Sequence, residues 1–362
     1  MLIDRRAFLA SSAAALALPG CATLPTAGDA CAPLVPVDVS MGRVIRMLAG
    51  LRPYRASGFV VRREPLGTKT LVHNYGHGGA GITLSWGSSK LAIDLGLSGH
   101  SGPVAVIGAG VMGLTTARLV QEAGFPVTIY AKAMPPDTTS NIAAGQISPF
   151  GHYREGAVTD EWRQQFLAAM DYSWRRFQRM AGPDYGIRWL PTYEQGSDPG
   201  PPALAAYSPN SQRLTPAQHP FPVEPIVRFD TMYVETPRFL ARLMADALRA
   251  GGQIQVRDFA SPADIESLPE NLVFNCTGLG SHALFGDEEL QPVRGQLAVL
   301  EPQPEVRYAA SGEWGYMFPR PDGIILGGTF ERDVWDSAPN PARIARIVAS
   351  HEEVFDNFRC RP

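Results

Sequence analysis

The most constraining feature of this chain is a glycine-rich turn that joins a short apolar run to a helical pattern. Residues 104–107 read Val-Ala-Val-Ile, which suits a buried parallel strand, and residues 108–113 read Gly-Ala-Gly-Val-Met-Gly. In such a turn Gly108 permits a tight bend, Gly110 lets the backbone approach a pyrophosphate, and Gly113 lets the helix pack on the strand. The helix N-terminus then presents unpaired N–H groups to phosphates. The pattern predicts a dinucleotide-binding strand, turn and helix.

A second apolar run at residues 127–130 extends this unit, but its end departs from the usual pattern. An acidic residue normally follows there and binds the adenine ribose, whereas this chain has Ala131 and Lys132. A lysine at this point favours a 2′-phosphate, as in NADP, or is a solvated surface charge. The two-strand unit alone leaves both interpretations open.

Further blocks of the sequence resemble the D-amino-acid oxidase family of FAD enzymes. They cover nearly everything from about residue 42 onward, at residues 50–55, 73–83, 138–145, 274–278, 292–296, 316–319 and 326–330. The resemblance implies that FAD is the cofactor. It also implies the residues that bind it: Gly108, Gly110, Val111, Met112, Gly113, Thr138, Thr139, Ser140, Ala144, Gly145, Thr277, Gly278, Gly78, Gly81, Ile82 and Thr83.

The same resemblance assigns the residues that hold the substrate. Arg52 would bind the substrate carboxylate through its planar fork, and the Tyr316 hydroxyl would donate to the same group. The carbonyl of Gly79 would accept from the amine and fix which face of Cα meets the flavin, while Thr83 would lie near the flavin O2. Arg52 and Tyr316 each have a structural alternative: Arg52 could be only an ion-pair partner, and Tyr316 only an aromatic residue of the core.

Other polar residues near these motifs have less direct parts. Arg55 is the more probable structural arginine of its block. His73 and His77 suggest an acid/base pair, but in their glycine-rich surroundings we expect them to brace the loop. We identify no His, Cys, Asp or Glu spacing typical of a metal site.

The order of the blocks is unusual for the family. The arginine block and the His73 block normally come last, yet here they precede Gly108, and the chain stops after a helical pattern at residues 342–358 that should lead into them. This order is what a circular permutation produces, with the old ends joined through residues 87–103 and new ends opened between residues 361 and 41. Folds tolerate such changes in exposed loops.

The cysteines agree with this order. Cys31 and Cys360 flank the proposed opening, so we predict a disulfide between them; the alternative is two unpaired thiols in the tails. Cys276 falls in a predicted buried strand and is interpreted as an unreactive packing residue.

The N-terminus carries an export pattern. Arg5 and Arg6 form a twin-arginine motif, and the apolar stretch at residues 7–18 is too short to span a bilayer. Residues 18–21 resemble a lipobox that would lipidate Cys21, although simple cleavage to a soluble periplasmic product remains an alternative. Residues 22–40 are predicted to be a Pro-rich tether. We therefore expect a periplasmic protein, either anchored by lipid or soluble, in an oxidising compartment that permits the disulfide.

The predicted fold is α/β: an FAD-binding Rossmann-like domain plus an α+β substrate domain with a mixed antiparallel sheet, circularly permuted. The 362 residues suffice for two domains after a signal and tether at residues 1–40. Residues 41–66, 151–231 and 296–362 are assigned mainly to the substrate domain, including a helix at 160–180 and a strand near 58–63. Residues 67–150 and 232–295 are assigned mainly to the FAD domain, including a strand at 232–235.

Three departures from the family pattern bear on the substrate. The lid segment at residues 301–314 is short, and Gly312 stands where a second tyrosine is often found, which suggests a more open pocket walled by Trp314. Phe330 occupies a position where the D-aspartate branch is expected to carry arginine. We therefore expect neutral or bulky substrates over acidic ones.

The sequence thus predicts FAD-dependent oxidative deamination of D-amino acids to a 2-oxo acid, ammonia and hydrogen peroxide. The first alternative is a dehydrogenase that acts on D-amino acids or other amines and passes electrons to a quinone or other carrier. The second is a non-catalytic flavin-containing envelope binding protein. A net charge of −3 gives no electrostatic case for nucleic acid, and the oligomeric state is undetermined.

Overall fold

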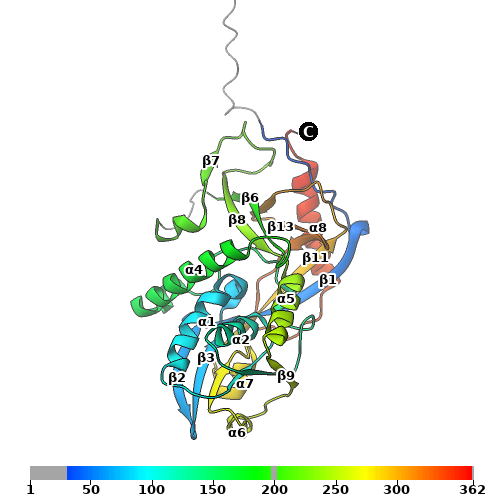
Figure 1. The fold of residues 1–362 in the computed structure, drawn as a ribbon. Coiled ribbons are helices and arrows are strands. Elements are labelled where there is room, and N and C mark those ends of the chain that lie inside the picture. Colours follow the sequence, from blue (N-terminus) through cyan, green and yellow to red (C-terminus); the bar gives the residue numbers. More distant parts are fainter. Residues whose placement is uncertain (1–30, 197–201, 361–362) are drawn as a thin grey trace, which may run out of the picture.

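The computed structural model describes residues 31–196 and 202–360, and Figure 1 shows their arrangement. The predicted signal, with Arg5, Arg6 and Cys21, lies outside the described residues. The strands are β1 Val44–Tyr54, β2 Val60–Leu66, β3 Lys69–Tyr75, β4 Val104–Ile107, β5 Val127–Ala131, β6 Ile187–Gln195, β7 Gln212–Leu214, β8 Ile226–Val234, β9 Gln253–Val256, β10 Leu272–Asn275, β11 Gln291–Leu300, β12 Ala309–Gly312, β13 Gly315–Arg320, β14 Gly323–Gly327 and β15 Glu331–Arg332.

The helices alternate with the strands mainly in the middle of the chain. They are α1 Gly81–Leu97, α2 Val111–Glu122, α3 Thr139–Ile142, α4 Asp160–Met180, α5 Thr236–Arg249, α6 Pro262–Glu266, α7 Gly280–Phe285 and α8 Pro341–Asp356, with short 3₁₀ turns at Met41–Arg43, Gly78–Ala80, Glu155–Ala157 and Pro202–Tyr207. Among these described residues, no helix is both long and apolar enough to cross a bilayer.

The first sheet carries the predicted nucleotide unit. Its strand order is β2-β3-β10-β4-β5-β9, and every neighbouring pair is parallel except β2 with β3. Strands β4, β10 and β3 are almost fully buried because both faces of the sheet are covered. The strand, turn, helix and strand predicted around residues 104–130 are confirmed as β4, α2 and β5.

Helices cover both faces of this parallel sheet. On one face, apolar side chains of α1, α2, α4 and α5 form a single core with the strands. On the other face, Ile265 of α6 and Leu284 of α7 pack on Leu71, Ala105 and Val273. Helix α4 was expected in the substrate domain, but it lies against α1, where the Gly87 N–H donates to Ser173 Oγ at 2.8 Å.

The second sheet is mixed and mainly antiparallel. Its order is β1-β11-β14-β13-β12-β6-β8-β7, with β15 beside β11. Side chains of β11 alternate: Leu297 and Val299 face one core, while Ala298 and Leu300 face the other. Helix α8 covers the core that contains Ala298 and Leu300 with its side chains Ile344, Ile347 and Val348. The core that contains Leu297 and Val299 lies on the opposite face of the mixed sheet, toward the parallel sheet.

Two strands pair differently from the sequence prediction. Residues 58–63 were expected to complete the substrate sheet, but β2 pairs with β3 at the edge of the parallel sheet. Strand β1 completes the mixed sheet instead, beside β11. Residues 232–235 were expected in the nucleotide domain, but they end β8, which pairs with β6 in the mixed sheet. Partner choice depends on distant residues, so the local pattern of a strand does not determine it.

Residues 22–40 were predicted to be a tether, whereas residues 32–40 pack against the folded protein. This segment, which we call the strap, runs along the mixed sheet and α8 (Figure 1). Val37 and Val39 are buried in the core under α8, and the Tyr308 hydroxyl donates to the Val35 carbonyl at 2.9 Å. The predicted Cys31–Cys360 disulfide is present, with 6.5 Å between the two Cα atoms, and joins the strap to the chain end after α8.

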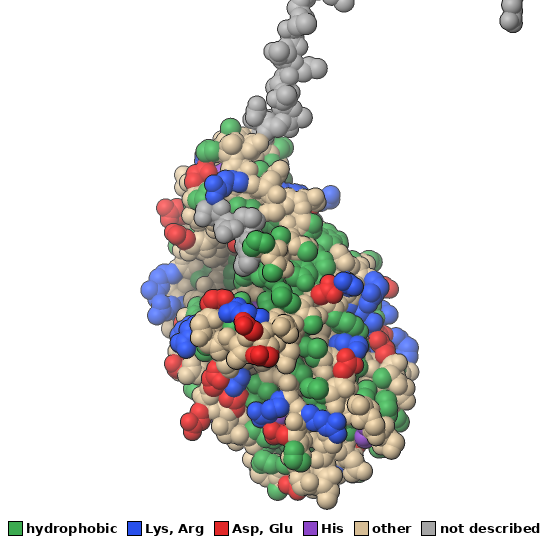
Figure 2. Space-filling model, turned by 90° about the vertical axis from the view of Figure 1, so that its left-hand side faces the viewer, with side chains coloured by type: hydrophobic (Ala, Val, Ile, Leu, Met, Phe, Trp, Pro, Cys, Tyr) green, Lys and Arg blue, Asp and Glu red, His purple; other side chains and the backbone are tan. Residues whose placement is uncertain are grey.

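The outer surface carries charges of both signs. On the face drawn in Figure 2, Lys and Arg side chains alternate with Asp and Glu among apolar ones, and neither sign forms a continuous field.

Candidate functional site

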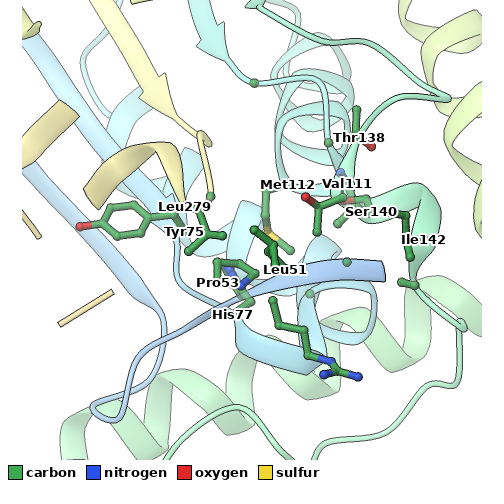
Figure 3. A pocket seen from close by; sticks show the side chains of 18 of the residues that line it. Leu51, Pro53, Tyr75, His77, Val111, Met112, Thr138, Ser140, Ile142 and Leu279 are labelled. Atoms are coloured by element: carbon green, nitrogen blue, oxygen red, sulfur yellow. Dashed lines mark hydrogen bonds between the residues drawn. The ribbon is translucent and has the colours of Figure 1, made fainter. Parts of the chain in front are cut away.

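A cavity of about 780 Å³ lies where the two sheets meet. It is lined by segments near residues 50–53, 75–82, 107–112, 131–150, 257–260 and 276–284, and by Gly295, Leu297, Tyr316 and Phe318. Figure 3 shows Leu51 and Pro53 projecting from β1, with Val111, Thr138 and Ser140 close together at one side. Its size is typical of a site for a large cofactor or ligand.

The glycine turn forms one end of the cavity as predicted. Gly108 has φ +112, and a Cβ there would press on the Cys276 carbonyl, so this position requires glycine. Gly110 caps α2, and the Val111 N–H beside it donates to Ser140 Oγ at 3.0 Å. The helix N-terminus therefore faces the cavity with its positive dipole end, which suits a pyrophosphate.

The structure separates the predicted cofactor residues into two groups. Most of them line the cavity: Gly108, Gly110, Val111, Met112, Thr138, Thr139, Ser140, Ala144, Gly145, Thr277, Gly278, Gly78, Gly81 and Ile82. Gly113 and Thr83 do not. A Cβ on Gly113 would overlap the Gly108 carbonyl oxygen, so this glycine lets α2 pack on the turn. Thr83 Oγ1 accepts from the Ser148 N–H at 3.0 Å and so orders the loop that borders the cavity.

The far end of the cavity is polar. Lys132, at the end of β5, is exposed and lines the cavity in the place where the ribose-binding acid was expected. Asp137 and Asp258 also line it, from the loops that follow β5 and β9. A carboxylate that could bind the adenine ribose is therefore present at this end, but Asp258 supplies it from the loop after β9 and not from the end of β5.

Arg52, Tyr316 and Gly79 come together at the other end. The Arg52 guanidinium lies over Gly295, where an added Cβ would be 2.5 Å from Arg52 Cζ, and its Nη1 donates to the Thr329 carbonyl at 3.0 Å. Burial raises the pKa of Tyr316, while the positive charge of Arg52 acts in the opposite direction. A Cβ on Gly79 would lie 3.7 Å from Arg52 Cδ, so all three residues border one small volume.

The residues expected to be structural are so. Arg55 forms ion pairs with Asp287 at 2.9 Å and Glu289 at 2.8 Å and does not line the cavity. The ring nitrogens of His73 contact Glu64 and the Asn275 amide, both at 2.9 Å.

His77 braces the glycine loop from inside. Its Nε2 pairs with Ser88 Oγ at 2.8 Å and its ring stacks on Phe59. Burial, with a smaller effect of His152, lowers the pKa of His77 to about 3. An imidazole with so low a pKa is a weak base, which agrees with a bracing role.

The expected opening beside Gly312 is absent. A Cβ on Gly312 would lie 2.5 Å from Trp314 Nε1 and 2.6 Å from Gln195 Oε1, so these side chains already occupy the space. Trp314 packs edge-on against His351 and Phe355 and does not line the cavity, so the prediction that it walls the pocket was wrong.

Several lining residues were missed from the sequence. Gln146, Ser148 and Phe150 line the cavity from the loop after α3, and the ring of Phe150 is half-exposed there. Phe318 lines it beside Tyr316, two residues along β13, where the alternation of the strand places both rings on one face. The loop residues have no spacing that marks them, whereas Phe318 was detectable from that alternation.

These residues fit FAD. A helix N-terminus behind a glycine turn matches a pyrophosphate, small residues leave the cavity wide, and the Arg52 end leaves space for a small carboxylate beside the cofactor. Gly78, Gly81 and Ile82, at the start of α1, would border the flavin end.

Comparison with known proteins agrees with this site. The family model described as "FAD dependent oxidoreductase" (DAO) matches residues 22–95 and 103–361. The chain is 32% identical to the "D-amino-acid oxidase" of Streptomyces coelicolor, covering 69% of this chain and 76% of that protein. It is 31% identical to the "D-amino-acid oxidase" of Rubrobacter xylanophilus, covering 67% of this chain and 74% of that protein.

Among solved structures, the glycine oxidase of Bacillus cereus has a similar fold. The TM-score is 0.52 at 17% sequence identity, over 70% of this chain and 78% of that one. The family match and the cofactor cavity lead to one conclusion: this chain belongs to the DAO family of FAD-dependent oxidoreductases.

Proposed function

We propose that the protein oxidises D-amino acids to 2-oxo acids, with release of ammonia and hydrogen peroxide. The observation that carries the proposal is the meeting of Arg52, Tyr316 and Gly79 at one end of a dinucleotide cavity. A cation, a hydroxyl and a carbonyl are the groups needed to hold a carboxylate and an amine on one carbon. The two relatives named as D-amino-acid oxidases support this choice of substrate.

When bound, FAD would supply the two-electron acceptor, which O₂ would reoxidise. Arg52 binds the substrate carboxylate through charge-assisted hydrogen bonds, and the Tyr316 hydroxyl, close enough to Arg52 to feel its charge, donates to the same carboxylate. The Gly79 carbonyl accepts from the substrate amine. With both groups held, Cα presents one face, so the D isomer directs its hydrogen toward the cofactor.

Bond changes in this reaction need no side-chain base. The hydrogen on Cα leaves with its electron pair while the nitrogen lone pair forms the C=N bond, and water then hydrolyses the imino acid to the 2-oxo acid and ammonia. His77, which lines the cavity, forms a hydrogen bond with Ser88, and its pKa is far below neutrality. The substrate amine must therefore be neutral when it reacts.

Substrates with neutral side chains are the proposed class. The ring of Phe330 lies 6.0 Å from the Arg52 guanidinium, so the group next to the carboxylate site is apolar. Neutral or bulky side chains would gain contact area there, whereas a second carboxylate would lose hydration at an aromatic surface.

The test is anaerobic mixing of the FAD-loaded protein with a panel of D- and L-amino acids while the flavin absorbance is followed. We expect D isomers alone to bleach the flavin, and air to restore it with stoichiometric peroxide. Slow reoxidation of the flavin in air, together with fast reoxidation by a quinone, would show that the enzyme is a dehydrogenase and not an oxidase. Bound flavin that no amino acid reduces would overturn the proposal and leave a binding protein.

We also propose export by the twin-arginine route, with lipidation at Cys21. The support is the Arg5-Arg6 motif together with a disulfide that needs an oxidising compartment. The double variant R5K/R6K should keep the protein in the cytoplasm of a host that has this route. Fractionation followed by blotting would contradict the proposal if both versions partitioned alike.

A further inference from the structure

Tyr316 is held by contacts on every side. Its ring stacks on Phe318 with centroids 4.7 Å apart and nearly parallel planes. A Cβ on Gly327 would collide with that ring, and one on Gly328 would lie 2.9 Å from the hydroxyl. These contacts limit where the hydroxyl can point.

The backbone of Tyr316 has a partner from outside the sheet. His351, on α8, is fully buried, and its Nε2 lies 3.0 Å from the Tyr316 carbonyl oxygen. Its Nδ1 lies 2.7 Å from the Ile347 carbonyl oxygen one helical turn earlier. A neutral imidazole carries one hydrogen, and both ring nitrogens here face carbonyl oxygens, so His351 donates to Tyr316 in the tautomer with hydrogen on Nε2 and to Ile347 in the other. None of the family motifs described above contains His351.

The neighbours of His351 are shaped to admit its ring. Trp314 meets it edge-on at 4.9 Å between centroids, and a Cβ on Gly315 would lie 2.9 Å from His351 Cε1. Gly315 also has φ +118, so the turn into Tyr316 needs glycine for its backbone and leaves room for the imidazole. The residues 314–316 and His351 thus form one packed unit.

We propose that His351 is a positioning residue, which holds the Tyr316 backbone so that the phenol hydroxyl meets the substrate carboxylate beside Arg52. The inference rests on the proposed function, because it assigns Tyr316 to the substrate. Without the imidazole, the Tyr316 carbonyl loses a buried donor and α8 loses its polar link to β13. The ring of Tyr316 then shifts relative to Arg52, and carboxylate binding weakens while the chemistry at Cα is less affected.

The test compares H351F, which keeps a ring but no donor, with H351Q, whose amide can donate to the Tyr316 carbonyl. H219F is the matched control, because His219 is also fully buried and pairs with Glu224 far from the cavity lining. For each FAD-loaded variant, KM and kcat for one D-amino acid, the Kd of its 2-oxo acid, flavin content and Tm are measured.

We expect H351F to raise KM and the 2-oxo acid Kd about tenfold, the factor that corresponds to one hydrogen bond of about 1.4 kcal/mol. H351Q should recover most of this, and H219F should lower Tm without changing KM. A purely structural role would instead lower Tm alike in H351F and H219F with KM unchanged, and would overturn the proposal. If H351F does not fold, H351M replaces it with the same expectation.

A wild-type protein that oxidises no D-amino acid would refute the proposed function. In that case the Kd of the 2-oxo acid still tests the inference, since weaker carboxylate binding in H351F alone would support the positioning role and equal binding would refute it.

Discussion

At the scale of single residues, Arg52 and Arg46 offer a direct comparison, because both lie on β1. Arg52 lines the cavity beside Tyr316, whereas Arg46 is exposed and pairs with Asp322 at 2.8 Å. We expect R52M to lower kcat/KM for D-amino acids by about a hundredfold or more, since it removes two charge-assisted hydrogen bonds. R46M should leave kcat/KM unchanged. Steady-state peroxide assays on both variants test this, and equal effects would contradict the assignment of Arg52.

Two buried histidines set a dependence of stability on pH. Burial lowers the pKa of His77 to about 3 and of His152 to about 4, from an ordinary value of 6.5. Below pH 6.5 the unfolded chain therefore binds more protons than the folded protein, and the free energy of unfolding falls as the pH drops. This contribution is complete above pH 6.5 and declines toward each lowered pKa.

His152 allows that dependence to be measured. Its ring lies among Tyr153, Trp162 and Phe166, and neither nitrogen has a hydrogen-bond partner, so H152F should fit the site. Between pH 7 and pH 5 we expect H152F to lose about 2 kcal/mol less stability than the wild type. Urea denaturation at pH 5, 6 and 7 gives both slopes, and identical slopes would rule out His152 as a source.

At the scale of elements, the turn before α2 separates folding from cofactor binding. A Cβ on Gly110 would meet Ser140 Oγ at 3.1 Å and nothing closer, so G110A should fold normally. The added methyl group would nevertheless stand where the backbone approaches the pyrophosphate. We expect at least a tenfold loss of FAD affinity, measured by flavin fluorescence titration of the apoprotein. G156A, where a Cβ meets nothing within 4 Å, is the control, and equal FAD affinity in both variants would count against this site.

Elements were predictable where their signals are local. The span of α4, Asp160–Met180, matches its prediction, because Thr159 caps it by accepting from the Trp162 N–H and its apolar residues repeat at helical spacing. Strands β2 and β8 were recognised but assigned to the wrong sheets, since the choice of partner depends on residues far along the chain. In the site, Arg52 and Tyr316 were predictable because they lie in motifs of the sequence. His351 and Phe150 were not, because their contacts with Tyr316 and with the cavity depend on the three-dimensional fold and follow no spacing in the sequence.

At the scale of the whole molecule, the Cys31–Cys360 disulfide closes nearly the entire chain, with 329 residues of sequence separation. In the chain-entropy model, closing a loop of this length stabilises the folded protein by roughly 6 kcal/mol, with measured values often smaller. We expect C31S/C360S to unfold at lower temperature than the wild type and reductant to lower the wild-type Tm to the same value. A further drop of the double variant's Tm in reductant would show that the effect does not come from this bond.

The order of the blocks is proposed to be a circular permutation. The loop at residues 98–103, between α1 and β4, is largely exposed and shorter than the segment 87–103 first expected to join the old ends, because α1 extends to Leu97. The family model likewise matches on both sides of a gap at residues 96–102. Cys31 and Cys360 are held together by the disulfide, with 6.5 Å between their Cα atoms, so residues 32 and 360 can be joined by a short linker.

A reordered chain tests this directly. It would begin in the loop at residues 98–103, run to residue 360, and continue through a short linker into residues 32–97. We expect it to fold and bind FAD with an absorbance spectrum like that of the original order. The matched control opens the chain instead within α4 and should fail to fold. A reordered chain that collapses like the control would contradict the permutation.

The cavity draws its lining from both sheets and from segments as distant in sequence as Gly50 and Phe318. A ligand that binds only when these segments are assembled shifts the folding equilibrium by mass action, in proportion to the logarithm of its concentration over its Kd. Loading and folding of this protein are therefore one linked equilibrium. Supply of the cofactor in the cell would then govern how much folded protein survives proteolysis, whatever the rate of the reaction it catalyses.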